Sequence, residues 1–280
     1  MTTLDGKVIL LTGATDGMGR ALAADLARAG ATVLVHGRDP GRIAATAVEV
    51  AEAVQAPGHR QGGVARLRTY QADFASLGEV RRLAEQILEA EPRLDVLVNN
   101  AGIGITQPGD GARQESADGI ELRFAVNYLA GYALSRLLLP LLIASAPSRI
   151  VNVASIGQQA IDFGDVQLTE GYDGMRAYRQ SKLAQVMNAF DLAGELTGSG
   201  VTVNSLHPAT FMPTKVSPAP PASTIAQGVA ATFRLIAAPS QQTGTGGFFN
   251  GLEESRANDQ AYDEAARGRL REISRELTGL

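Results

Sequence analysis

The sequence contains no cysteine and only three histidines among its 280 residues. Without thiols the chain cannot form a disulfide, a thiolate zinc site or a cysteine nucleophile, and this composition fits a reducing cytoplasm. Basic residues are not in excess either, because the formal net charge is −4. A basic stripe for nucleic acid or for an anionic membrane surface is therefore not expected.

Long apolar runs are also scarce. The start, MTTLDGKVILLTG, has no basic region ahead of a long apolar core, so a signal peptide is not expected. The most apolar stretch, ALSRLLLPLLIASA from Ala133, contains Arg136 and Pro140 and is too short to span a bilayer. With 45% hydrophobic residues, the chain can bury a large core. We predict a soluble, cytoplasmic protein without a membrane segment.

Short β-branched runs alternate with alanine-rich amphipathic stretches along the chain, a pattern typical of a parallel sheet between two layers of helices. Strands are expected at 7–11, 31–36, 65–70, 94–100, 148–155 and 201–207, and a seventh near Gly246. Helices are expected around 18–29, 40–54, 76–90, 117–145, 174–197, 223–237 and 259–277. No repeat or linker divides the chain, so residues 1–280 are predicted to form one doubly wound, Rossmann-type α/β domain with a mostly parallel sheet.

A glycine pattern, TGATDGMGRALA, follows the first predicted strand and precedes a helix. Glycines there allow a tight turn and close approach of the backbone to a pyrophosphate, and the helix N-terminus attracts phosphate. A turn with packing duties alone is the alternative, and a Walker loop is excluded because no Gly-Lys-Ser/Thr follows. Asp16 is an unfavourable neighbour for a phosphate. The candidate cofactor contacts are Gly13, Thr15, Asp16, Gly17, Met18 and Gly19.

The end of the second strand, VLVHGRDPGR, indicates which dinucleotide is bound. A ribose 2′-hydroxyl is usually met by a carboxylate, whereas a 2′-phosphate is met by Arg or Lys. Gly37 stands where the acid is expected and Arg38 follows, which favours NADP(H). Two alternatives stay open: Arg38 is a solvated loop residue, or Asp39 takes the role of the acid. Asp39 precedes Pro40 and looks more like a helix N-cap.

Two further strand ends offer cofactor contacts. Asp73 can bind an adenine amino group, with Phe74 lining its pocket, but Asp73 is equally suited to capping the helix that starts near Ser76. The Asn-Asn-Ala-Gly run after the fourth strand lets a cofactor lie against backbone, and its second Asn can lock neighbouring strands through its side chain. The candidates in that run are Asn100, Ala101 and Gly102.

Tyr178 and Lys182, in AYRQSK, are spaced i, i+4 on a predicted helix and therefore share one face. An ammonium near a phenol favours the phenolate, so we expect the pKa of Tyr178 to lie below its reference value of about 10. A surface pair is the alternative for this spacing alone. Ser155 at a strand end and Asn127, a poor helix former inside a predicted helix, extend the set; a turn serine and a capping asparagine are their alternatives.

Taken together, these motifs resemble the short-chain dehydrogenase/reductase family over essentially the whole chain. The insert between Ser155 and Tyr178 and the run SKLAQVMNAFDLA are similar to the retinol-dehydrogenase-like, NADP(H)-dependent subgroup. The resemblance implies a Rossmann-type sheet and nicotinamide-dependent carbonyl/alcohol chemistry. The matching elements are TGATDGMG, Asp73, NNAG, Asn127, Ser155, Tyr178-x-x-x-Lys182 and HPAT at 207–210, where the family often has Pro-Gly after the histidine. Pro208 and Thr210 are thereby implied as cofactor contacts.

We expect a division of labour among the catalytic candidates. Tyr178 donates a proton in reduction and accepts one in oxidation, and Ser155 holds the substrate oxygen. Lys182 lowers the pKa of Tyr178, and both residues contact the nicotinamide ribose side of the cofactor. Asn127 is expected to sit in a helix irregularity that holds a proton-relaying water. His36 and His207 are assigned to strand ends, with His36 alternatively near the adenosine phosphate, and no metal site is expected.

The substrate side rests on two loops, 157–174 and 211–222, expected to wall the cleft. Their apolar residues predict a pocket for an apolar carbonyl or alcohol, unless the loops only pack on each other: Phe163, Val166, Leu168, Tyr172, Phe211, Met212 and Val216. A non-catalytic NADP(H) sensor is the rival hypothesis, and the short length disfavours a sugar-nucleotide epimerase. Helices 117–145 and 174–197 often pair between subunits in this family, which predicts a homodimer or homotetramer, although the tail helix can instead fold back on its own chain.

Overall fold

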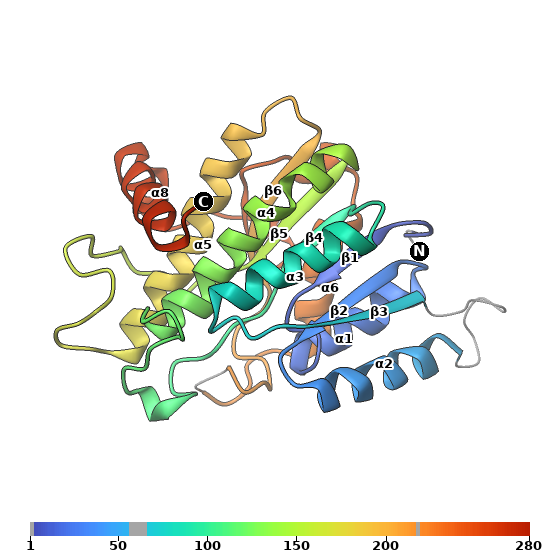
Figure 1. Ribbon diagram of the computed structural model, residues 1–280, viewed down its shortest axis with the longest axis horizontal. Helices are drawn as coiled ribbons and strands as arrows, with labels where there is room; N and C mark the ends of the chain where they lie inside the picture. Colours follow the sequence, from blue (N-terminus) through green and yellow to red (C-terminus); the bar gives the residue numbers. More distant parts are fainter. Residues whose placement is uncertain (1–2, 56–65, 217–218) are drawn as a thin grey trace.

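The computed structural model describes residues 3–55, 66–216 and 219–280, and eight strands of this part form one sheet (Figure 1). The strand order is β3-β2-β1-β4-β5-β6-β7-β8; all pairings up to β7 are parallel, and β8 is antiparallel at the edge. The strands are β1 (Val8–Leu11), β2 (Thr32–Gly37), β3 (Arg66–Gln71), β4 (Val96–Asn99), β5 (Ser148–Val153), β6 (Val201–His207), β7 (Phe248–Asn250) and β8 (Glu253–Glu254).

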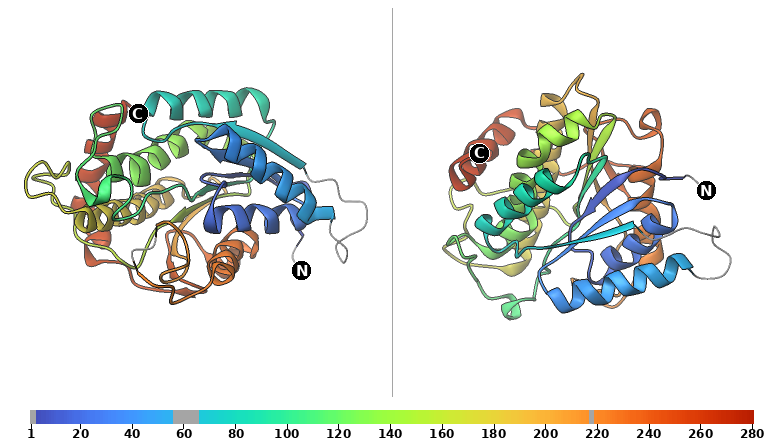
Figure 2. Two further views of the ribbon diagram at one scale, coloured as in Figure 1. Left: turned by 90° about the horizontal axis from the view of Figure 1, so that it is seen from below. Right: turned by 45° about the vertical axis from the view of Figure 1, so that its right-hand side comes forward.

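Helices cover both faces of this sheet (Figure 1, Figure 2). One face carries α1 (Gly17–Arg28), α2 (Pro40–Gln55) and α6 (Ile225–Ala237). The other carries α3 (Leu77–Ala90), α4 (Ala130–Ala144), α5 (Gly174–Glu195) and α8 (Glu264–Thr278). The shorter elements are the 3-10 turns η1 (Gly109–Gly111) and η3 (Asp259–Tyr262), the helix α7 (Ser240–Thr243) and the π-helical η2 (Phe124–Leu129), which leads into α4.

The central strands are buried on both sides, which explains their almost continuous apolar sequence. In β1, Ile9 and Leu11 pack under α1 and α6, whereas Val8 and Leu10 point to the opposite core. This alternation follows from the two-residue repeat of a strand, and burial on both faces is typical of parallel sheets covered by helices. The predicted single Rossmann-type α/β domain is confirmed, with one more strand than expected because of the two-residue β8.

Two predicted helices begin later than expected. The stretch 117–120 is a turn in which Gly119 has φ +73°, and the helix that leads into α4 starts after Glu121. The stretch 259–277 is divided at Asp263, whose carboxylate caps α8 after the short turn η3. The predicted third strand is confirmed from Arg66 onward, while its expected first residue, Ala65, lies outside the described residues.

One long apolar helix bears on the expectation that no segment crosses a membrane. Together, η2 and α4 form a helix, Phe124–Ala144, which is the one helix in the described ranges that is long and apolar enough to span a bilayer. The 14-residue run from Ala133 was judged too short to span a bilayer because it did not include the preceding π-helical turns, which lengthen the helix. Most of the stretch is buried in the core on the α3 and α5 side of the sheet, as in core helices of globular domains. Cytoplasmic location stays a prediction.

The C-terminal helix folds back on its own chain. In Figure 1, α8 lies along α5, and Arg271 Nη1 donates to Asp191 Oδ2 of α5 at 2.5 Å. The Tyr128 hydroxyl of η2 also bonds Ser274 Oγ of α8 at 2.7 Å in a buried position. Of the two alternatives for the tail helix, intrachain packing is therefore what the structure shows. A homodimer or homotetramer stays a prediction.

Candidate active site

A cleft of about 920 Å³ opens at the carboxyl ends of β1, β4, β5 and β6. In the sheet, β1 lies between β2 and β4: the chain adds β2 and β3 on one side of β1 and then crosses back to add β4 on the other side. Doubly wound sheets bind ligands at such switch points. The volume is at the upper end of the usual range of about 300–1,000 Å³. Every predicted cofactor contact lines the cleft: Gly13, Thr15, Asp16, Gly17, Met18, Gly19, Arg38, Asp73, Phe74, Asn100, Ala101, Gly102, Tyr178, Lys182, Pro208 and Thr210.

The glycine turn is tight enough that side chains cannot replace its glycines. A Cβ on Gly19 would lie 2.2 Å from the Gly13 carbonyl oxygen, and a Cβ on Gly13, whose φ is +65°, would lie 2.7 Å from Ala101 Cα. Asn100 Nδ2 donates to the carbonyl oxygens of Thr12 (2.8 Å) and Gly13 (3.1 Å). The prediction that Asn100 locks neighbouring strands is thereby confirmed. Thr12 was missed; its hydroxyl accepts the amide protons of Asn100 and Ala101.

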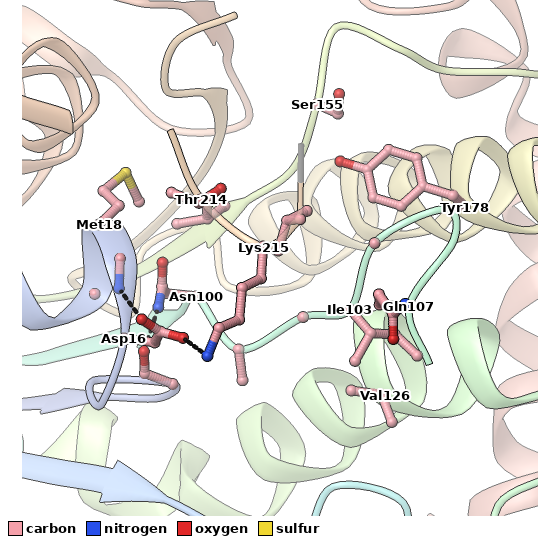
Figure 3. A pocket seen from close by; sticks show the side chains of 18 of the residues that line it. Asp16, Met18, Asn100, Ile103, Gln107, Val126, Ser155, Tyr178, Thr214 and Lys215 are labelled. Atoms are coloured by element: carbon pink, nitrogen blue, oxygen red, sulfur yellow. Dashed lines mark hydrogen bonds and ion pairs between the residues drawn. The ribbon is translucent and has the colours of Figure 1, made fainter. Parts of the chain in front are cut away.

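Asp16 is the N-cap of α1 and forms two ion pairs across the cleft. Its carboxylate accepts from the Gly17 amide at 2.9 Å and pairs with Arg42 Nη2 at 2.6 Å. It also pairs with Lys215 Nζ at 3.1 Å (Figure 3). Partial burial opposes ionisation, but these hydrogen bonds and ion pairs outweigh it and lower the pKa of Asp16 to about 2. The conflict expected between Asp16 and a phosphate is therefore offset by two cations that sequence reasoning missed.

The end of β2 shows why no acid stands there. A Cβ on Gly37 would lie 2.6 Å from Thr15 Cγ2, so this position has no room for a carboxylate side chain. Arg38 is exposed at the edge of the cleft, and its guanidinium has no hydrogen bond or ion pair with any other residue of the described ranges. Asp39 accepts from the Arg42 amide at 2.8 Å in the first turn of α2, which confirms its predicted capping role.

His36 connects the glycine turn to the wall that follows β3. Its Nδ1 accepts from the Gly13 amide at 3.3 Å, its Nε2 donates to the Ala72 carbonyl at 3.1 Å, and its ring stacks on Phe74 at 4.5 Å. Burial lowers the pKa of His36 to about 4, so the ring is neutral at physiological pH. The sequence had left His36 undecided; the structure places it inside the scaffold of the site.

Asp73 lies on the cleft but does not cap α3. The cap is Ser76, whose hydroxyl accepts from the Glu79 amide at 3.3 Å, while Asp73 Oδ1 accepts from Ala75 N at 2.9 Å. Of the two alternatives for Asp73, the helix cap is therefore wrong. Contact with the adenine amino group stays a prediction.

Tyr178 and Ser155 face each other at the other end of the cleft (Figure 3). Tyr178 lies on α5, whose N-cap is Asp173, and Ser155 follows β5, where its Oγ accepts from the Gly157 amide at 3.0 Å. Burial raises the pKa of Tyr178, and the hydrogen bond with Ser155 lowers it to a smaller extent. The expected fall of this pKa below its reference value is therefore wrong for the structure, because desolvation of the phenolate dominates.

Lys182 lies too far behind the Tyr178 ring to reverse that shift. Its Nζ is 5.8 Å from the ring centroid and donates to the Val153 carbonyl and to Gln185 Oε1, both at 2.9 Å. Burial lowers the pKa of Lys182 to about 7, so only part of the Lys182 population carries a positive charge at neutral pH. The i, i+4 spacing was correct, but burial decided how the two groups titrate.

Asn127 stands behind the cleft in the π-helical η2, so the predicted helix irregularity is confirmed. Its side chain does not line the cleft. Its Oδ1 accepts from Ile103 N at 2.7 Å, and its Nδ2 donates to Ile103 O at 3.2 Å and to Ser181 Oγ at 3.0 Å. Through these bonds Asn127 connects the loop after β4 to α5, the helix that carries Tyr178 and Lys182. The π-helical geometry is common at functional sites.

The two predicted substrate loops differ in what they present to the cleft. From the segment 211–222, Phe211, Met212 and Val216 line it as expected. From the insert 157–174 only Gly157 does so. Its large side chains pack inward instead, which corrects the expectation that they wall the pocket: Phe163, Val166, Leu168 and Tyr172. Apolar content alone could not distinguish a cleft wall from a core contact.

The stretch Phe211–Val216 lies across the cleft (Figure 3). A Cβ on Gly17 would lie 3.0 Å from Thr214 Cγ2, and a Cβ on Gly104 would lie 2.7 Å from the Val216 carbonyl oxygen. The stretch therefore touches the glycine turn at one end and the loop after β4 at the other. Phe211 has φ +46°, a left-handed conformation that non-glycine residues rarely adopt.

Comparison with known proteins adds the following findings. A family model described as short chain dehydrogenase matches residues 7–220. Retinol dehydrogenase 14 of Homo sapiens is 36% identical over 99% of this chain and 88% of its own length. Retinol dehydrogenase 13 of Homo sapiens is 35% identical over 99% and 86%.

Solved structures show the same similarity. An uncharacterized protein from Mycobacterium paratuberculosis superposes with a TM-score of 0.79 at 25% identity, covering 100% of this chain and 96% of that one. The active-site complex of Pseudomonas aeruginosa RhlG with NADP superposes with a TM-score of 0.68 at 28% identity, covering 89% and 95%. In that second structure NADP is part of the complex.

Proposed function

The chain belongs to the short-chain dehydrogenase family, as a member similar to retinol dehydrogenases, and we propose that it transfers a hydride between NADP(H) and an apolar carbonyl or alcohol. Membership makes it an oxidoreductase of alcohol and carbonyl groups. The observation that carries the finer proposal is that Tyr178 and Ser155 line the same cleft as the glycine turn and Arg38, whose guanidinium has no ion pair with another residue of the described ranges.

The residues of the cleft fit a nicotinamide dinucleotide. The glycine turn exposes backbone amides at the N-terminus of α1, where a pyrophosphate is favoured. Arg38 is available for a 2′-phosphate, and Gly37 leaves no acid to repel it. When bound, the nicotinamide supplies the hydride in reduction and takes it in oxidation. NADP complexes among the structural relatives support the choice of NADP(H).

The proton is handled by Tyr178. Because burial raises its pKa, the phenol keeps its proton at neutral pH and can donate it from Oη to the oxygen of a carbonyl being reduced. Ser155 Oγ already accepts from the Gly157 amide, so its own proton is free to bond the same oxygen and hold it beside Tyr178. Lys182 and Asn127 support this pair from behind, through Val153 and Ile103.

The substrate is proposed to be an apolar aldehyde, ketone or alcohol. The end of the cleft near Tyr178 is lined mostly by aliphatic and aromatic side chains, among them Ile103, Ile105, Val126, Ile156, Phe211 and Val216. Retinol in the names of the relatives makes all-trans-retinal one sensible probe, alongside aliphatic and aromatic aldehydes and ketones.

The test is a panel of such carbonyls, followed by the loss of NADPH absorbance, with Tyr178→Phe as the control. We expect turnover of at least one apolar carbonyl by the unaltered protein and its loss in Tyr178→Phe, while NADPH fluorescence titration gives similar affinities for both. Tight NADPH binding with no turnover across the panel, or equal turnover by Tyr178→Phe, would instead support the non-catalytic sensor.

A further inference from the structure

Arg123 is a fully buried arginine that lies just ahead of η2 and outside the residues assigned to catalysis. Its guanidinium donates to three oxygens: Nε to the Gly104 carbonyl at 2.9 Å, Nη2 to the Ile105 carbonyl at 2.5 Å, and Nη1 to the Tyr172 hydroxyl at 2.7 Å. Burying a guanidinium is unfavourable unless it is paired and hydrogen-bonded. These bonds therefore hold the three groups firmly in place.

Glu121 balances the charge. The Tyr172 hydroxyl donates to Glu121 Oε1 at 2.8 Å, and this carboxylate lies 3.9 Å from Arg123 Nη1. Burial, together with the nearby Glu121, raises the pKa of Tyr172, so its hydroxyl stays protonated and can accept from Arg123 while donating to Glu121. We refer to Glu121, Arg123 and Tyr172 as the Arg123 network.

The Arg123 network joins two walls of the active-site cleft. Gly104 and Ile105 follow β4 and line the cleft beside Ile103, both of whose backbone groups are held by Asn127. Three consecutive residues are thus fixed by two side chains of one helix. Tyr172 lies immediately ahead of α5, the helix that carries Tyr178.

The same junction is sterically tight. A Cβ on Gly174, the first residue of α5, would lie 2.7 Å from the Ile105 carbonyl oxygen. The start of α5 and the loop after β4 are therefore in direct contact at the point where the Arg123 network ties them together.

We propose that Arg123 is a positioning residue: by holding residues 104–105 and Tyr172 together, it sets where the substrate wall lies relative to Tyr178. This inference rests on the proposed function, because it assigns Arg123 to the alignment of the carbonyl group with the Tyr178 hydroxyl. Misplacement of reacting groups by about 1 Å can lower a rate on the order of 10²-fold. Arg123 touches no reacting atom and acts through the two walls.

The first test compares Tyr172→Phe with a matched control, Tyr70→Phe. Tyr70 also donates a buried hydrogen bond to a glutamate, Glu91 Oε1 at 2.7 Å, that is paired with an arginine, Arg68, but none of these residues lines the cleft. We expect Tyr172→Phe to lower kcat/KM for the best carbonyl of the panel roughly tenfold or more, with an NADPH Kd within about twofold of the unaltered protein. Tyr70→Phe should change neither. Equal kinetic effects of the two variants would overturn the proposal.

Two further variants guard against loss of folding. Arg123→Lys keeps the charge but loses the fork of donors, and Gly174→Ala presses a methyl group against Ile105 O without removing any hydrogen bond. Both should lower kcat/KM with NADPH binding retained. If Gly174→Ala is as active as the unaltered protein, alignment at this junction does not govern the rate and the proposal is wrong.

Amide hydrogen exchange in residues 101–112 gives a readout that needs no substrate. In the NADPH-bound protein, Tyr172→Phe should accelerate exchange there, and Tyr70→Phe should not. Unchanged exchange would show that the network does not hold the loop. Failure of the unaltered protein to turn over any carbonyl would refute the proposed function and the kinetic part of this inference, whereas faster exchange would still establish the mechanical link.

Discussion

Replacing Asp16 by asparagine should tighten NADPH binding. The Asp16 carboxylate lies in the glycine turn, where we propose that the cofactor phosphates bind, and it pairs with both Arg42 and Lys215. Asparagine is as good an N-cap as aspartate, so α1 should keep its start. The change therefore removes one negative charge and frees two cations for the phosphates of a dinucleotide.

The size of the effect follows from the two ion pairs. Both pairs are substantially exposed, and such pairs are worth about 0.2–1 kcal/mol each. In Asp16→Asn neither ion pair has to be broken when NADPH binds, so the free energy of binding should be more favourable by about 0.4–2 kcal/mol, which lowers Kd roughly 2- to 30-fold. Since the pKa of Asp16 is about 2, the carboxylate is ionised throughout the neutral range, and the gain should not depend on pH there.

The assay is NADPH fluorescence titration at low and at high salt, with Asp25→Asn as the control. Asp25 lies on the same helix and pairs with Arg28, so this control makes the same charge change on α1 away from the cleft. We expect a gain only for Asp16→Asn, and a smaller gain at high salt because exposed charges are screened. Weaker NADPH binding by Asp16→Asn would refute the reasoning and would indicate that the Asp16–Lys215 pair helps to hold the cofactor.

Three further predictions concern the cofactor and the pH dependence. Arg38→Ala should weaken NADPH binding about tenfold, because one or two exposed charge-assisted hydrogen bonds are lost, and it should leave NADH binding unchanged in parallel titrations. Equal losses of affinity for both would contradict a 2′-phosphate contact. Gly37→Asp should not convert the protein to NADH but should lower its melting temperature, because the added Cβ meets Thr15 at 2.6 Å; tighter NADH binding by a stable variant would be the contrary result. The pKa of Tyr178 is raised by burial, and reduction needs its proton, so kcat/KM for reduction should stay level across the neutral range and fall only as pH rises through the pKa of that phenol, above its ordinary value of about 10. A fall centred near pH 7 would instead implicate Lys182, whose pKa is about 7.

Much of the fold was readable because its signals are local. Each buried strand is a short apolar run, and the helices between them repeat with their own period, so element type followed from neighbours in the sequence. The helix at 117–145 was drawn too long because residues 117–120 form a turn, in which Gly119 has φ +73° and its amide donates to the Ser116 carbonyl oxygen. The π-helical turn around Asn127 depends on a distant contact, since the Asn127 side chain bonds Ile103 in the loop after β4. The short β8 carries too little pattern to be recognised.

The sequence by itself determined which groups reach the cleft from strand ends and helix faces: the glycine turn, Asn100, Ser155 and the i, i+4 pair Tyr178 and Lys182. Parallel strands bring their carboxyl ends to one edge, so order along the chain was enough to gather these residues. Only the tertiary structure decided how they behave. Burial raised the pKa of Tyr178 against the sequence expectation, and Lys215, about 200 residues from Asp16, became its ion-pair partner. Burial and long-range pairing depend on the whole packed chain, and no local pattern records them.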